Sequence, residues 1–246
     1  MQTYLKLTWM QLKLFGREPV ALFFTLAFPL MVMLLFGVIF GNEIDPQYGG
    51  RYGYIDALVP ALTAIIIGTV ALMSIPVATA TDREQKILRR YKATPMPPLV
   101  YMAADITMHV FMALIGLVIL IIAALLVFDL RFGGNWVYVL GGFLLSALAF
   151  AAVGYLVAGL SPTGRIAQVV GPVLFFPMMF LSGAAFPPEI MPEGVRAAAN
   201  WLPLTHVVIL LQNLWFGQGW HGLSVLILGL MLVLGTLVSV YTFRWE

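Results

Sequence analysis

Charged residues are scarce in this chain. Asp, Glu, Lys and Arg make up 10% of its 246 residues, whereas hydrophobic residues make up 61%. Soluble domains carry about 25% charged residues, which they need to cover their surface. The shortage excludes an ordinary soluble domain and indicates that lipid is the solvent for most of the chain.

Cysteine is absent altogether, which excludes a disulfide framework, thiolate metal sites and cysteine catalysis. The sequence also lacks the phosphate-loop pattern GxxxxGK[ST], the metalloprotease pattern HExxH and the hydrolase pattern GxSxG. Without a phosphate loop the chain cannot use ATP alone. If it moves a molecule uphill, the energy must come from another chain.

Six apolar stretches are long enough to cross a bilayer, which takes about 20 helical residues. They cover approximately residues 20–41, 54–80, 102–128, 136–160, 166–186 and 221–243. The segments between them leave no room for a separate soluble domain. The sequence therefore predicts an all-α integral membrane protein with one transmembrane domain, residues 1–246.

The basic residues are divided unequally between the two sides that six crossings define. Ten of the 13 fall before span 1, between spans 2 and 3, between spans 4 and 5, or after span 6. The opposite side holds Arg51, Arg131 and Arg196. The positive-inside rule therefore predicts that both termini are cytoplasmic. All tryptophans fall at or outside a predicted span end, where indole prefers the headgroup region.

The cytoplasmic segment TDREQKILRRYKATPMPP, residues 81–98, has the signals of a short helix. Thr81 and Glu84 predict a capping box, and Pro95 predicts a helix end by Thr94. The expected apolar stripe is Ile87, Leu88 and Tyr91, and the expected basic face is Arg83, Lys86 and Arg90. Such a helix suits docking into a groove of a soluble partner, and the alternative is a basic loop that touches anionic lipid.

The residues before span 1 predict an amphipathic helix on the inner leaflet, ended by Gly16 and Pro19. Its basic face is Lys6, Lys13 and Arg17, and its apolar face is Leu5, Trp9 and Leu12. This helix is expected to be an interfacial anchor. The alternative is an elbow that transmits movement into span 1.

The outer segment after span 5, residues 186–220, is divided by prolines. Two short helices are predicted, at Glu193–Trp201 and Leu204–Phe216, and neither can span. Because irregular backbone at membrane depth must be buried in protein or line a wet cavity, we expect them to dip into the outer leaflet. They form either an outer gate or a surface flap. Within the spans, Pro172 and Pro177 predict that span 5 is the most broken.

Asp105 and His109 are an ionisable pair near the cytoplasmic start of span 3, four residues apart. Ionisable residues inside a membrane are functional candidates because burying a charge in lipid is costly. One interpretation is a proton or substrate role. The other is that Asp105 caps the helix or pairs with a nearby basic residue.

Two stretches resemble the ABC-2 type permeases, the membrane subunits of bacterial ATP-binding-cassette exporters. They are TDREQKILRRYKATPMPP and LSGAAFPPEIMPEGVRAAANWLPLTHVV, residues 181–208. The resemblance covers essentially the whole chain and looks nearest to the drug- and lipid-export branch, of the daunorubicin permease kind. It implies that the first stretch is a coupling helix that docks on an ATPase, and that the second holds re-entrant outer helices. The coupling residues that it implies are Asp82, Arg83, Glu84, Lys86, Ile87, Leu88, Arg90 and Tyr91.

The resemblance also implies partners and a location. Two cytoplasmic ATPase subunits would carry ATP and Mg, and a second permease copy or a homologue would pair with this chain in a bacterial or archaeal cytoplasmic membrane. The chain itself is expected to bind no cofactor, metal or nucleic acid. An amphipathic drug or lipid would leave along a path lined by spans 1, 2 and 5, including Phe175, Phe176 and Phe180. The alternatives are a flippase for lipid-linked polysaccharide, a sensing or immunity protein, and a membrane enzyme, against which the missing motifs argue.

Overall fold

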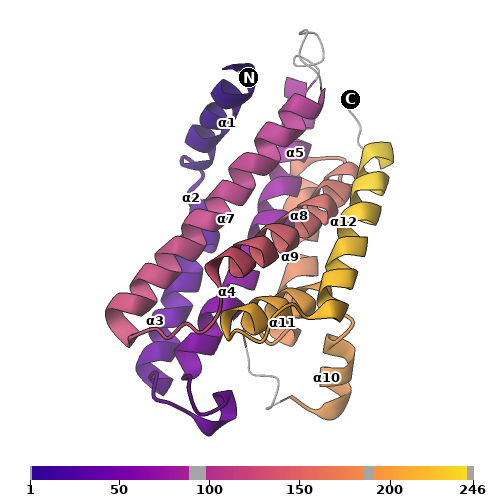
Figure 1. Ribbon diagram of the computed structural model, residues 1–246. Helices are drawn as coiled ribbons and strands as arrows, with labels where there is room; N and C mark the ends of the chain where they lie inside the picture. The colour runs from indigo at the N-terminus through magenta and orange to yellow at the C-terminus, as the bar shows by residue number, and fades with distance from the viewer. Residues whose placement is uncertain (1, 89–97, 186–190, 243–246) are drawn as a thin grey trace.

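The computed structural model describes residues 2–88, 98–185 and 191–242. Within these ranges the protein is helical, with no strand (Figure 1). Six helices are long and apolar enough to cross a membrane: Pro19–Phe40, Tyr54–Glu84, Met102–Phe128, Trp136–Leu160, Gly164–Leu181 and Gly222–Ser239. The predicted all-α membrane fold with six spans is therefore confirmed.

The elements in chain order are α1 (Gln2–Phe15), α2 (Pro19–Leu22), η1 (Phe23–Ala27), α3 (Phe28–Phe40), η2 (Pro46–Tyr48), α4 (Tyr54–Thr69), η3 (Val70–Ser74), α5 (Ile75–Glu84), α7 (Pro98–Phe128), α8 (Trp136–Leu160), α9 (Gly164–Leu181), α10 (Glu193–Ala199), α11 (Pro203–Trp215) and α12 (Gly222–Thr242). The first span consists of α2, η1 and α3, and the second of α4, η3 and α5. Spans three to six are α7, α8, α9 and α12.

Both described ends of the chain lie at one end of the bundle (Figure 1). We call this the terminal end, and it comprises α1, residues 84–88 and the turn at residues 161–163. The opposite, far end comprises the loops at residues 41–53 and 129–135, together with α10. This arrangement agrees with an even number of crossings.

The second span is the central column of the bundle. In its most apolar stretch 94% of the residues are buried inside the protein, against 22–33% for the first, third, fifth and sixth spans. It packs against helices of the first, third, fourth and fifth spans, and also against α11. The outer spans therefore keep exposed apolar faces that suit lipid or another chain.

The first and second spans each contain a π-helical turn. The turn η1 of the first span ends two residues before Pro29, and the turn η3 of the second span ends two residues before Pro76. Proline has no N–H to donate to the carbonyl four or five residues earlier, so the helix widens locally. The prediction that span 5 is the most broken is wrong. Its helix α9 continues through Pro172 and Pro177 and ends at Leu181, before the predicted residue 186.

The carbonyls of Ala71 and Leu72, to which Pro76 cannot donate, face glycines on neighbouring helices. A methyl group at Gly154 of α8 would lie 2.1 Å from the oxygen of Ala71. One at Gly171 of α9 would lie 2.3 Å from the oxygen of Leu72. Glycine at both positions therefore permits α8 and α9 to approach the central helix closely.

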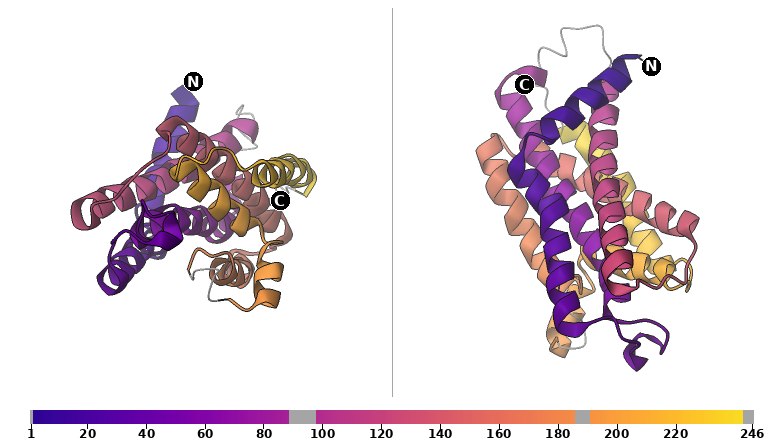
Figure 2. Two further views of the ribbon diagram at one scale, coloured as in Figure 1. Left: turned by 60° about the horizontal axis from the view of Figure 1, so that its bottom comes forward. Right: turned by 90° about the vertical axis from the view of Figure 1, so that its left-hand side faces the viewer.

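The helices α10 and α11 form the short pair predicted before the last span, and they meet at an angle of 87°. Seen from the far end, α11 crosses the end of the bundle (Figure 2). Most of its residues are buried, whereas α10 is mostly exposed, so α11 is not a surface flap. The side chain of Trp215 in α11 is 1% exposed, so protein covers its indole.

Candidate functional site

The segment predicted as a coupling helix begins at the terminal end. Thr81 does not start a helix there, because α5 runs from Ile75 through Thr81 to Glu84. The capping-box prediction is therefore wrong. The chain turns at Lys86, whose φ angle of 59° is left-handed, and this turn separates α5 from the residues that follow.

Beyond this turn the chain folds back onto α1. Leu88 is fully buried and packs with Leu7 of α1 and Ala104 of α7. Lys86 is exposed and Ile87 is half-buried. Two of the predicted coupling residues, Arg90 and Tyr91, lie outside the described residues. The apolar stripe expected to face a partner thus includes one residue, Leu88, that packs within the chain itself.

Arg83 and Glu84 bind the turn between α8 and α9. Arg83 Nη2 donates to the carbonyl of Ala158 at 3.2 Å and also to the carbonyl of Ser161. Glu84 Oε2 accepts the N–H of Gly164 at 3.0 Å. The C-terminal end of α8 carries partial negative charge and the N-terminal end of α9 carries partial positive charge, so each side chain meets the helix end that it favours.

Asp105 is the centre of a buried polar cluster and is 4% exposed. Its carboxylate accepts hydrogen bonds from Gln11 Nε2 of α1 at 3.3 Å and from Tyr155 Oη of α8. His109 Nδ1 lies 3.5 Å from Asp105 Oδ2 and 2.9 Å from the Asp105 carbonyl oxygen. The structure thus brings the predicted pair together and adds two partners. The cluster joins α1 to the third and fourth spans.

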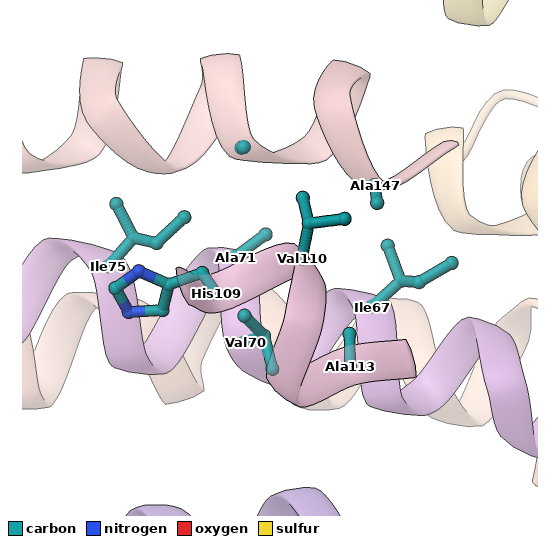
Figure 3. Close-up of a pocket in the computed structure, with 9 residues that line it drawn as sticks. Ile67, Val70, Ala71, Ile75, His109, Val110, Ala113 and Ala147 are labelled. Carbon is teal, nitrogen blue, oxygen red and sulfur yellow. The ribbon is translucent and has the colours of Figure 1, made fainter. Parts of the chain in front are cut away.

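A small pocket lies beside this cluster, between the second, third and fourth spans (Figure 3). His109 lies at one end of it, next to Ile75. The other lining residues are aliphatic: Ile67, Val70, Ala71, Val110, Ala113, Ala147 and Ala151. The pocket has room for about one water molecule. It is therefore too small for a drug or a lipid.

A second buried polar cluster lies at the far end and was not predicted from the sequence. Asp56 is 0% exposed and accepts hydrogen bonds from Asn42 Nδ2 at 3.0 Å and from the backbone N–H groups of Gly53 and Arg131, both at 2.8 Å. Arg131 Nη1 also lies 3.5 Å from Asp56 Oδ2. The available signal was an acidic residue inside the predicted span at residues 54–80.

The far-end cluster continues into α11. Trp215 Nε1 donates to the carbonyl of Arg131 at 3.3 Å, and the N–H of Gly133 donates to the carbonyl of Trp215 at 3.3 Å. Gln212 Nε2 donates to the carbonyl of Ala57 at 3.1 Å. These bonds attach α11 to the second span and to the loop between the third and fourth spans.

The three phenylalanines predicted to line a pathway do not share one environment. Phe175 is 1% exposed and lies against Gly68 of the central helix. The ring of Phe176 is 5.6 Å from that of Phe175 and is half-buried. Phe180 is 44% exposed. Phe175 is therefore a residue of the protein core, and the other two lie progressively nearer the surface of α9.

A model of the ABC-2 type transporter family matches residues 2–216, most of the chain. The chain therefore belongs to the ABC-2 type transporter family, and its six candidate spans are those of a multi-span membrane protein.

Several curated proteins are similar to this chain. Nodulation protein J of Rhizobium leguminosarum bv. trifolii is 35% identical over 81 residues, which are 33% of this chain and 31% of that protein. The inner membrane transport permease YadH of Escherichia coli (strain K12) is 23% identical over 188 residues, or 75% of this chain and 72% of YadH. The daunorubicin resistance ABC transporter permease protein DrrB1 of Streptomyces coeruleorubidus is 22% identical over 214 residues, or 85% of this chain and 73% of DrrB1. The last two names describe transport permeases rather than enzymes.

Proposed function

We propose that this chain is the membrane-spanning subunit of an exporter driven by ATP that a separate ATPase subunit hydrolyses. The observation that carries the proposal is the family match over residues 2–216, in a sequence that has no phosphate loop of its own. A permease without a nucleotide site needs a partner that has one. Two ATPase copies, each binding ATP and Mg, would serve a pair of permeases.

The terminal end of the bundle is assigned to the cytoplasm in this proposal. The unequal division of the basic residues supports it, because ten of the 13 fall on the side of that end. Arg83, Glu84 and Leu88 bind groups within the chain. The ATPase contact therefore falls mainly on exposed Lys86 and half-buried Ile87, together with Arg90 and Tyr91.

The proposed cargo is an amphipathic drug-like molecule or a lipid. The similarity to a daunorubicin resistance permease over 85% of the chain supports this class. The pocket beside His109 is far too small for such a molecule, which favours a path between two copies of the chain. The first and fifth spans, only 22% and 28% buried, offer faces for that path, with Phe176 and Phe180 on the fifth.

Purification from native membranes tests the proposal. A tagged copy should carry with it a phosphate-loop ATPase that hydrolyses ATP. Lys86→Glu should lower the amount of bound ATPase, because the side chain is exposed at the proposed contact. The matched control is Arg51→Glu, a charge reversal at an exposed residue of the far end. Recovery of the intact permease with no ATPase would contradict the proposal.

A further inference from the structure

Three residues at the C-terminal end of α5 contact the end of α8 or the start of α9. Glu84 accepts the N–H of Gly164, and Arg83 binds the last carbonyls of α8 just before the turn. Thr81 lies so near Gly164 that a methyl group there would come within 2.3 Å of Thr81 Oγ1. The turn between α8 and α9 is thus attached to the end of the central span by two charged groups and by a close contact.

These attachments are not needed to start α9. Its N-cap residue is Thr163, whose Oγ1 accepts the N–H of Ile166 at 3.3 Å in the ordinary way. At the end of α8, the N–H of Ser161 bonds to the carbonyl of Val157 at 3.0 Å. Because each helix end has local bonds of its own, the bonds from Arg83 and Glu84 serve to join the helices to α5.

The same three helices are also in close contact further into the bundle. Gly154 of α8 and Gly171 of α9 bring both backbones against the carbonyls of η3 in the second span. The second span therefore touches α8 and α9 from η3 to its last residue. Elements packed along their length in this way are displaced together, because a well-packed interior deforms little.

We propose that Arg83 and Glu84, held at their distance from α9 by the contact between Thr81 and Gly164, are positioning residues that transmit movement of the cytoplasmic segment to the fourth and fifth spans. This inference rests on the proposed function, in which an ATPase moves the segment that follows α5. A displacement of Lys86 would then reach α9 through the Glu84–Gly164 bond, with no need for α9 to touch the ATPase.

A reporter on α9 tests the inference in the complex with the co-purified ATPase, reconstituted in liposomes. The chain has no cysteine, so Gln168→Cys, at an exposed position of α9, provides the only thiol of this chain. Its rate of reaction with a maleimide is measured without nucleotide and with ATP and vanadate. In the parent protein ATP should change this rate.

Gly164→Ala should abolish the ATP-induced change, since the new methyl group pushes α9 away from Thr81. Adding Thr81→Ala should restore the change, because the nearest atom at that position is then its Cβ, 3.4 Å away, an ordinary contact. The control Gly229→Ala adds a methyl group to α12 where nothing lies within 4 Å, and it should leave the change intact. Arg83→Ala should diminish the change without adding bulk.

The amount of bound ATPase separates the two proposals. Gly164→Ala should bind as much ATPase as the parent, so that only the movement of α9 is lost. The inference is overturned if Gly164→Ala keeps the ATP-induced change, if Thr81→Ala fails to restore it, or if the parent shows none. If no ATPase binds the parent, the proposed function fails as well.

Discussion

Replacing Asp56 by alanine is expected to destabilise the protein by about 3–5 kcal/mol, because it leaves three hydrogen-bond donors without the fully buried carboxylate that they bind. The carboxylate accepts three hydrogen bonds, at 2.8–3.0 Å, and faces Arg131 Nη1 at 3.5 Å. Hydrogen bonds to a charged group contribute about 1.5–3 kcal/mol each, but removal of the carboxylate also relieves its own burial cost. The net loss therefore lies below the sum of the three bonds.

Equilibrium unfolding in mixed micelles of a mild detergent and SDS, followed by tryptophan fluorescence, measures this loss. Asp56→Asn should fall between alanine and the parent, because the amide keeps one acceptor oxygen. Asp45→Ala is the control, at an exposed aspartate of the loop before α4 whose side chain accepts only the N–H of Gln47, and it should cost less than about 1 kcal/mol. A loss of less than about 1 kcal/mol for Asp56→Ala would show that the three hydrogen bonds to the carboxylate contribute little to stability.

Two further substitutions test the packing and the polar cluster at the terminal end. Asp105→Asn should lower the free energy of unfolding by about 3 kcal/mol in the same micelles, because it leaves partners of a buried carboxylate unsatisfied. Limited proteolysis should also cut α1 faster in this variant than in the parent. Equal rates of cleavage would contradict the role of the cluster in attaching α1. Gly154→Ala should cost about 1–3 kcal/mol through overpacking against Ala71. The same change at Gly229, where nothing lies within 4 Å, should not destabilise, and equal losses at both glycines would show that the contact is unimportant.

The spans could be predicted from the sequence because each is a continuous apolar stretch of the necessary length. The two short outer helices could also be predicted, since prolines mark their beginnings. The consequences of prolines inside spans could not. Pro29 and Pro76 follow π-helical turns, whereas Pro172 and Pro177 are accommodated in a continuous helix, and the neighbours that decide this are far away in the sequence.

The candidate site was predictable only in part. The spacing of Asp105 and His109 placed them on one helix face, but their partners Gln11 and Tyr155 come from other helices. The roles of Arg83 and Glu84 could not be predicted, because both side chains bind backbone groups. Every residue has such groups, so the sequence does not indicate which of them is the partner. Local capping rules therefore gave Glu84 the wrong partner.

ATP-driven transport by the reconstituted complex is the direct test of the proposed exporter. The permease and its co-purified ATPase are placed in liposomes with the ATPase outside, and accumulation of daunorubicin and of a fluorescent phospholipid in the lumen or inner leaflet is followed. We expect ATP to drive accumulation of at least one of the two probes, and we expect Lys86→Glu to lower this accumulation. A bound ATPase that hydrolyses ATP while neither probe moves would contradict the assignment of an exporter for amphipathic molecules.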